Sequence, residues 1–274
     1  MLEEAVQGSV VPAEQAASLA SEHGVGVAEL MGLLVPLAAA RYATAPISGF
    51  RVGAVARGSS GALYLGANLE LPGTALALTV HAEQSAAASA WLHGEEGLAA
   101  LAVSAPPCGH CRQFLNELVT AGSLELLVAG RKPRLLPELL PDSFGPADLG
   151  VAAGLLSPRA NGLALESEDP LVLAALAAAE ASYAPYSRGF AGVALETASS
   201  AVHIGRYAEN AAFNPSLTPL ACALALRALA GGAGDEITRA VLVQAPSQVD
   251  HTGATAEALR AVSAVALEVF QTVP

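Results

Sequence analysis

Apolar residues recur along this chain with two different periods, one typical of helices and one typical of strands. Helical spacing dominates about the first forty residues, where one segment opens at Pro12 and another covers residues 27–42. Beyond them, short β-like runs alternate with helical stretches, which favours an α/β fold with helices covering a sheet. The first two of these runs flank a Gly-Ser-Ser-Gly turn at residues 58–61 and should form a hairpin. Strands are expected at residues 50–56, 63–66, 98–104 and 124–129, and helices at residues 79–93 and 108–118.

Turn-forming residues of the first half recur in the second half at a constant offset of 139 residues. Gly53 corresponds to Gly192 and Gly66 to Gly205, and no gap is needed over about sixty residues. Further pairs at the same offset are Pro46 and Pro185, Ser48 and Ser187, Glu70 and Glu209, Leu78-Thr79 and Leu217-Thr218, and Pro107 and Pro246. Matched glycines, prolines and a glutamate are not expected by accident, so the sequence predicts a duplicated domain.

Composition limits the class of protein and its partners. The 274 residues suffice for two domains with cores of their own. A formal charge of −12 would repel a phosphate backbone, so no nucleic acid is expected as a partner. No membrane association is expected either, because no apolar run approaches the roughly 18 residues that span a bilayer and the first residues lack a basic, secretory start. Three cysteines, two of them in C-x-x-C, favour metal or redox use in a reducing cytoplasm over disulfide bonds.

Two short motifs carry the candidate chemistry. His81 lies near the start of one predicted helix, and Cys108 and Cys111 lie at the start of another. Zinc prefers nitrogen and sulfur donors in a tetrahedral shell, and helix N-termini stabilise thiolates. The three side chains therefore predict a zinc site with an open fourth position, an arrangement typical of catalytic rather than structural zinc.

Glu83 follows His81 by two residues and is predicted to be an acid/base rather than a ligand. It would take a proton from zinc-bound water and deliver it to N3 of a pyrimidine and then to the departing amine. The combination H-x-E and P-C-x-x-C is the signature of zinc-dependent nucleobase deaminases. Hydrolytic deamination of a pyrimidine, with one zinc ion per chain, is the function that these residues predict.

The same residues allow other interpretations. A lone C-x-x-C could be a redox pair. A closed, structural zinc site would need a fourth donor, for which the nearest candidate is His110, inside the C-x-x-C loop and strained to reach the same ion. Cys222, in an alanine-rich apolar stretch, is expected to be a small core residue.

The second copy does not retain the metal-binding groups. The positions equivalent to the three ligands are occupied by Leu220, Ser247 and Asp250, and the position equivalent to Glu83 by Cys222. The second copy is therefore predicted to be a metal-free structural partner. The expected organisation is an N-terminal helical segment at 1–26, a catalytic domain at 27–149, a linker at 150–169 and a degenerate copy at 170–274.

On these motifs the chain resembles cytidine deaminases, in particular the larger homodimeric bacterial type, over nearly its whole length. The resemblance lies in residues 66–70 (GANLE), 80–86 (VHAEQSA), 107–114 (PCGHCRQF) and 144–149 (FGPADL). It implies a three-layer α/β/α sandwich with a mixed sheet, duplicated, after a small N-terminal helical segment. It also implies deamination of cytidine and 2′-deoxycytidine to uridine and 2′-deoxyuridine with release of ammonia, a role in pyrimidine salvage, and a cytoplasmic homodimer with a shared active site.

The resemblance further implies that Asn68 and Glu70 hold the 3′-hydroxyl of the ribose. A buried amide and carboxylate would lose their partner if the ligand lacked that hydroxyl. On residue type alone, the less favoured alternative is that both are turn-forming polar residues after a strand.

Four more substrate contacts follow from the resemblance. Phe50 would lie beside the base, and the main chain of Ala82 would contact the carbonyl oxygen of the base. Phe144 and, from the second copy, Ala212 would reach the active site of a neighbouring subunit. Without the resemblance, both phenylalanines would be interpreted as core residues.

Rival functions differ in what they require of the chain. Related deaminases act on deoxycytidylate, guanine or polynucleotides, but Glu70 would place an acid beside the sugar, which disfavours a phosphate there. The charge of −12 and the lack of basic, aromatic-rich stretches disfavour polynucleotides. A catalytically silent zinc-binding or nucleoside-binding protein would have no use for Glu83.

Overall fold

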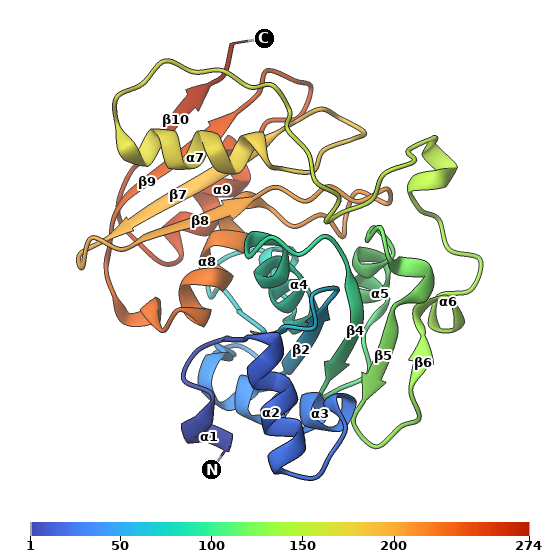
Figure 1. Ribbon diagram of the computed structural model, residues 1–274. Coiled ribbons are helices and arrows are strands. Elements are labelled where there is room, and N and C mark those ends of the chain that lie inside the picture. Colours follow the sequence, from blue (N-terminus) through green and yellow to red (C-terminus); the bar gives the residue numbers. More distant parts are fainter. Residues whose placement is uncertain (1, 274) are drawn as a thin grey trace. The chain divides into compact units, whose positions relative to one another are not determined.

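The chain forms two compact units in a computed structural model that describes residues 2–273 (Figure 1). The first unit comprises the residues up to Leu69 together with Val80–Ser157. The second comprises Glu70–Thr79 together with the residues from Pro158 onward. No single described helix is both long and apolar enough to cross a membrane, although two successive helices bent by 96° would pass that test together.

The first unit is built on a mixed six-stranded sheet of order β1-β3-β2-β4-β5-β6. Only β4 and β5 run parallel; the other neighbouring pairs are antiparallel, including the predicted β2–β3 hairpin. The strands are β1 (Val10–Val11), β2 (Gly53–Gly58), β3 (Leu63–Ala67), β4 (Leu98–Val103), β5 (Glu125–Val128) and β6 (Arg134–Leu135). The helices are α1 (Leu2–Ala5), α2 (Ala13–Glu22), α3 (Val27–Tyr42), α4 (Ala82–Leu92), α5 (Gly109–Leu115) and α6 (Leu136–Leu139).

The helical prediction for the N-terminal residues is wrong at one place. Val10 and Val11 form a short strand that pairs with Tyr64 and Leu63 at the edge of the sheet. Two β-branched residues suit an extended edge strand better than a helix. Such a strand is too short to leave a period of its own in the sequence.

The second unit repeats the central four strands of the first. Its sheet has the order β10-β9-β7-β8, with β9 and β10 parallel and the other pairs antiparallel. The strands are β7 (Ala191–Thr197), β8 (Val202–Arg206), β9 (Ile237–Gln244) and β10 (Leu267–Gln271). The helices are α7 (Pro170–Glu180), α8 (Pro219–Leu229) and α9 (Thr252–Arg260).

The register of the two hairpins confirms the duplication residue by residue. Ala54 pairs with Gly66 in the first unit, and Val193 pairs with Gly205 in the second, so both partners shift by 139 positions. The irregularity in the β2–β4 ladder at Arg57/Gly58 also has its counterpart 139 residues later.

Four glycines explain why the helices lie so close to the sheets. A Cβ atom on Gly53 would come within 3.0 Å of the backbone of α3, and one on Gly66 would do the same with α4. Gly192 and Gly205 stand in the same relation to α7 and α8. Gly66 pairs with Ala54, the neighbour of Gly53, and successive strand residues face opposite sides. Helices therefore cover both faces of each sheet, which confirms the three-layer α/β/α sandwich.

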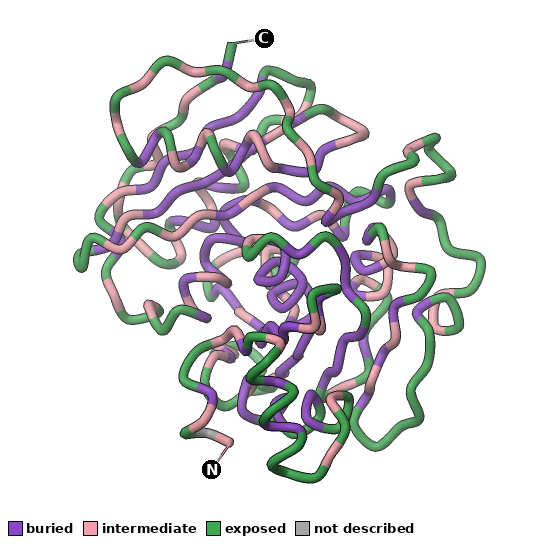
Figure 2. The backbone as a smooth tube through the Cα atoms, in the orientation of Figure 1, coloured by how far each residue is buried: buried purple, intermediate pink, exposed green. Residues whose placement is uncertain are grey.

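The buried core follows the strands and the helix faces that meet them (Figure 2). On the α3 side of the first sheet, Leu30, Leu34 and Ala38 pack with Val55 and Leu65 in one apolar cluster. An equivalent cluster in the second unit joins α7 to β7 and β9.

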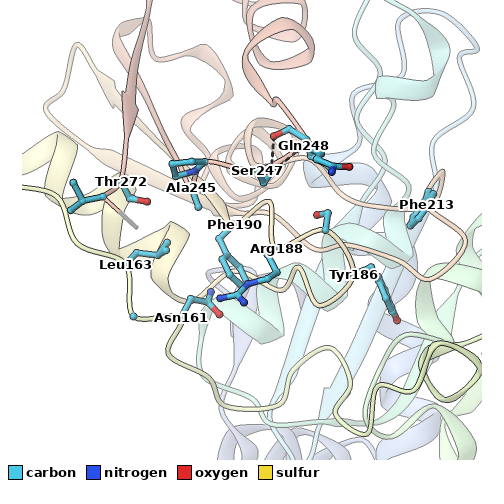
Figure 3. A pocket seen from close by; sticks show the side chains of 15 residues that line it. Asn161, Leu163, Tyr186, Arg188, Phe190, Phe213, Ala245, Ser247, Gln248 and Thr272 are labelled. Carbon is cyan, nitrogen blue, oxygen red and sulfur yellow. Dashed lines mark hydrogen bonds between the residues drawn. The ribbon is translucent and has the colours of Figure 1, made fainter.

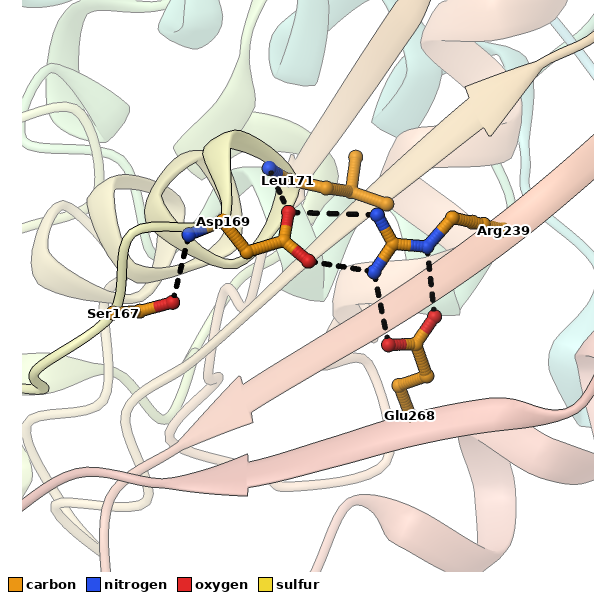
Figure 4. Close-up of polar contacts among 5 residues, drawn as sticks. All are labelled: Ser167, Asp169, Leu171, Arg239 and Glu268. Carbon is orange, nitrogen blue, oxygen red and sulfur yellow. Dashed lines mark hydrogen bonds and ion pairs between the residues drawn. The ribbon is translucent and has the colours of Figure 1, made fainter.

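A network of three charged side chains fixes the N-terminal end of α7 to the sheet of the second unit (Figure 4). Asp169 caps the helix by accepting the Leu171 N–H at 2.9 Å, and its other oxygen lies 2.7 Å from the guanidinium of Arg239 on β9. Nε and Nη2 of Arg239 also donate to the two carboxylate oxygens of Glu268 on β10, at 3.0 and 2.9 Å. The hydrogen bond and charge of Arg239 lower the pKa of Asp169, so this network holds its charges at neutral pH.

The helix-on-glycine contacts generate a stability prediction. Gly66→Ala and Gly205→Ala should each lower the free energy of unfolding by about 1–3 kcal/mol, because the added methyl group meets helix backbone. Gly32→Ala is the matched control: nothing lies within 4 Å of a Cβ on this exposed position inside α3, and alanine should stabilise the helix by up to about 1 kcal/mol. Urea denaturation measures the free energy of unfolding of all three variants. Equal stability of Gly66→Ala and Gly32→Ala would contradict the packing argument.

Candidate metal centre

Two helix N-termini meet at the candidate site. His81 is the N-cap residue of α4, and its main-chain N–H donates to the Gln84 side chain at 3.1 Å. Cys108 is the N-cap residue of α5, and its sulfur accepts the Cys111 N–H at 3.4 Å. The predicted helix at 79–93 begins later than expected, at Ala82, because residues 76–78 form a separate 3₁₀ turn.

The three predicted zinc ligands lie together. His81 Nδ1 is 3.1 Å from Cys111 Sγ and 3.6 Å from Cys108 Sγ, and the two sulfurs are 3.5 Å apart. Tetrahedral zinc with bonds of roughly 2.0–2.3 Å needs ligand atoms roughly 3.5–3.8 Å apart. The three side chains fit this requirement to within about half an ångström. Among the described residues, they are also the one group of His, Cys, Asp and Glu close enough to hold an ion.

The electrostatics of the two thiols favour a cation. A hydrogen bond from Cys111, supported by main-chain N–H groups, lowers the pKa of the Cys108 thiol to about 4. The same interaction, together with burial, raises the pKa of the Cys111 thiol well above its usual range. The first thiolate thus forms readily, but a second one beside it requires a positive charge. This donor set fits zinc.

Glu83 lies in the first turn of α4, beside the ligands but outside the ligand group. Its side chain is only 4% exposed, and it interacts with the Cys111 thiol. Burial raises the pKa of the Glu83 carboxyl. A buried carboxyl with a raised pKa beside the ligand group is suited to act as a general acid/base.

His110 does not join the ligand group. Its ring stacks on that of His81, with centroids 5.3 Å apart and planes 29° apart. Burial lowers the pKa of His110, which favours a neutral ring beside the ligand. The structure thus gives His110 a packing position against His81.

Asn68 is already engaged in holding the loop that carries Phe50. Its Oδ1 accepts the Val52 N–H at 2.9 Å, and its Nδ2 donates to the Phe50 carbonyl oxygen at 2.9 Å. Phe50 itself precedes β2 and its side chain is 62% exposed. Asn68 retains one N–H and one lone pair for other partners.

The other predicted substrate contacts lie in different surroundings. Ala82 is buried at the start of α4, whereas the ring of Phe144 is 46% exposed. The Phe144 carbonyl oxygen accepts hydrogen bonds from Gln113 at 2.7 Å and Asn116 at 3.1 Å. Glu70 and Ala212 belong to the second unit, the former buried and the latter exposed.

Arg112 is a supporting residue that the sequence did not single out. Its Nε donates to the Pro107 carbonyl oxygen at 2.9 Å and its Nη1 to that of Leu139 at 2.7 Å. It therefore fixes the main chain immediately before Cys108. Its place directly after the second cysteine was the only available signal.

The second unit has replaced the metal-binding groups by packing and hydrogen bonds. Leu220 and Cys222 are fully buried, and burial raises the pKa of the Cys222 thiol to about 11. Asp250 accepts hydrogen bonds from Gln244 and from the Thr252 N–H, both at 2.9 Å. No metal-binding group is found among the described residues of this unit.

Family models match both copies of the duplicated domain. The model of the family described as "Cytidine and deoxycytidylate deaminase zinc-binding region" matches residues 29–123, and a second model with the same description matches residues 136–257. The chain is 48% identical over 252 residues to a cytidine deaminase of Vibrio cholerae serotype O1, covering 92% of this chain and 85% of the relative. It is 48% identical to a Shewanella cytidine deaminase over 94% of this chain and 87% of the relative. The crystal structure of a Mycobacterium tuberculosis cytidine deaminase matches 43% of this chain and 96% of its own, with 35% identity and a TM-score of 0.39.

The ligand geometry predicts which substitutions remove zinc. His81→Ala, Cys108→Ser and Cys111→Ser should each reduce bound zinc from about one ion per chain to near none, because three protein donors are the minimum of such a site. Cys222→Ser, the same chemical change in the second unit, should retain the full zinc content. Elemental analysis after dialysis measures the zinc content of each variant. Retention of zinc by Cys108→Ser, or its loss from Cys222→Ser, would show that the ion is held elsewhere.

Proposed function

The chain belongs to the cytidine deaminase family, and on this premise we propose that it hydrolyses cytidine and 2′-deoxycytidine to uridine and 2′-deoxyuridine with release of ammonia. One observation carries this proposal: His81, Cys108 and Cys111 converge, and the buried Glu83 lies beside them without being a ligand. A purely structural ion would not need that carboxyl.

His81, Cys108 and Cys111 would hold the zinc ion. When bound, zinc supplies a nucleophile at neutral pH by lowering the pKa of a coordinated water to roughly 7. Glu83 would take one proton from the attacking water and deliver it to N3 of the cytosine ring as the water oxygen bonds to C4. The remaining hydroxyl proton would then pass through Glu83 to the 4-amino group, and the bond between C4 and that nitrogen would break as ammonia leaves. The raised pKa of Glu83 suits this role, because its carboxyl can both take and release a proton.

Phe50, Asn68 and Ala82 are proposed to position the nucleoside. The exposed ring of Phe50 would lie along the base, and Asn68 would hold the Phe50 loop through its hydrogen bond to the Phe50 carbonyl oxygen. The remaining N–H of Asn68 would donate to the ribose. The main chain of Ala82 would contact the carbonyl oxygen of the base. That Glu70 contacts the 3′-hydroxyl stays a prediction.

The same proposal covers assembly and cellular role. We propose a homodimer in which Phe144 and Ala212 reach the active site of the neighbouring subunit; the exposure of both residues supports this. The catalytic domain at 27–149, the linker at 150–169 and the zinc-free copy at 170–274 remain the proposed organisation. Free thiols at Cys108, Cys111 and Cys222 support a reducing cytoplasm, and the role in pyrimidine salvage follows from the proposed reaction.

Glu83→Gln tests the mechanism. The variant should keep about one zinc ion per chain but lose about 10²–10⁴-fold in cytidine turnover, because the amide cannot shuttle protons. Glu125→Gln, the same change on β5, should leave turnover unchanged. The assay follows the absorbance of cytidine, deoxycytidine, cytosine, deoxycytidylate and guanine. Full activity in Glu83→Gln would refute the proton shuttle, and a preference for deoxycytidylate would refute the substrate class.

Asn68→Asp tests the positioning of Phe50. The aspartate can still accept the Val52 N–H but cannot donate to the Phe50 carbonyl, and it places negative charge beside that oxygen. KM for cytidine should rise about tenfold, the effect of losing one hydrogen bond, while zinc content stays the same. An unchanged KM would separate Asn68 from nucleoside binding, and loss of zinc would indicate a general structural defect.

A further inference from the structure

The second unit contains a cavity of about 900 Å³ (Figure 3). This volume lies in the range of roughly 300–1,000 Å³ that is typical of small-molecule sites. Residues 186–190, just before β7, and residues 245–249, just after β9, form much of its wall. Asn161 and Thr272 contribute from two further segments of the same unit.

One wall of the cavity corresponds to the start of the cysteine loop in the first copy. Pro246 and Ser247 line it, and these residues correspond by the offset of 139 to Pro107 and Cys108. The cavity lies at the ends of β7 and β9, the strands that correspond to β2 and β4, whereas Leu220 and Cys222, equivalent to His81 and Glu83, do not line it.

Three aromatic rings provide flat apolar walls. Tyr186, Phe190 and Phe213 all line the cavity, and the Phe213 side chain is 65% exposed. In Figure 3 the Phe190 ring lies beside Arg188, while Tyr186 and Phe213 lie toward the other end. Aromatic faces of this kind stack on planar heterocycles such as nucleobases.

Arg188 gives the cavity its charge. It is the one charged side chain among the described lining residues, in a chain whose formal net charge is −12. Its guanidinium points toward Asn161 in Figure 3. A guanidinium with no carboxylate among the described residues of the same wall is suited to binding a phosphate through paired N–H donors.

The backbone of Arg188 is strained. Its φ angle is +57°, and the corresponding residue of the first copy is Gly49, with φ +67°. Glycine adopts this left-handed conformation without penalty, whereas arginine does not. The second copy thus retains the left-handed backbone that favours glycine but has arginine at this position. Strained backbone of this kind is found preferentially at functional sites.

The loop that carries Arg188 is held in place before any ligand arrives. Glu209, 3% exposed, accepts the N–H groups of Tyr186 at 2.8 Å and Ser187 at 3.1 Å. The Gly189 carbonyl oxygen lies 2.9 Å from His251 Nε2. A preordered loop lowers the entropic cost of binding.

We infer that this cavity binds a nucleoside monophosphate, with the base against the aromatic walls and the phosphate on Arg188. The site is distinct from the zinc centre, and its ligand differs from the proposed substrate by the phosphate group.

Binding of uridine 5′-monophosphate to the full-length, zinc-loaded protein tests this inference. Calorimetric titration gives Kd, and hydrogen–deuterium exchange locates the site. The nucleotide should slow exchange in residues 185–190 and 245–249. Arg188→Ala and Arg188→Gly should each raise Kd about tenfold, the effect of losing a charge-assisted hydrogen bond. Arg188→Gly should in addition raise Tm, because it relieves the left-handed strain.

Matched controls keep the outcome decisive. Arg260→Ala removes the same charge from the exposed end of α9, outside the cavity, and should leave Kd unchanged. Cytidine turnover should be unchanged in all these variants. Uridine and inorganic phosphate should each bind the cavity more weakly than the nucleotide. The inference is overturned if Arg188→Ala binds the nucleotide normally, if phosphate alone binds as tightly, if protection appears only around His81 and Glu83, or if Kd exceeds about 10 mM.

Discussion

The direct packing of helix backbone on strand glycines positions the site as well as the core. Because Gly66 has no side chain, α4 approaches β3 until the backbone of Ala82 and Ala86 lies where a Cβ would be. That depth sets where α4 begins, and hence where His81 and Glu83 lie. Cys108 and Cys111 come from α5, which follows β4 after a short connection. A histidine from one helix start and two thiols from another can converge only if both helices are set correctly against the sheet.

The convergence creates an electrostatic conflict that a cation resolves. Two thiols 3.5 Å apart and a buried carboxyl would bring up to three negative charges into a poorly solvated space. Helix N-termini offset part of this charge, but the opposite shifts of the Cys108 and Cys111 pKa values show that they do not offset all of it. The second copy has less negative charge to compensate: Ser247 and the buried Cys222 occupy the positions of Cys108 and Glu83, and Asp250 accepts hydrogen bonds from neutral donors.

Local chemistry made much of this predictable from sequence. The strand periods, the hairpin and the offset of 139 depend on neighbouring residues and on register, and the zinc ligands depend on spacing within helix starts. What escaped prediction depends on contacts between distant segments. The strand at Val10–Val11 exists only because β3 has a free edge, and Asn68 is engaged by Phe50 and Val52 through the folded loop. The assignment of Glu70 to the second unit has no signal in local sequence at all.

The second copy keeps the packing constraints of the first, although no group of metal donors is found among its described residues. Gly192 and Gly205 remain glycine because helix backbone occupies the space of their missing side chains, and no ligand is involved in that requirement. Gly49 is different, since nothing lies within 4 Å of a Cβ there and only its left-handed backbone favours glycine. A side chain in that conformation costs about 1–2 kcal/mol but meets no neighbouring atom, whereas a Cβ on Gly192 or Gly205 would displace helix backbone. Arg188 therefore occupies a position where the fold permits a side chain, at the wall of the cavity in the second unit.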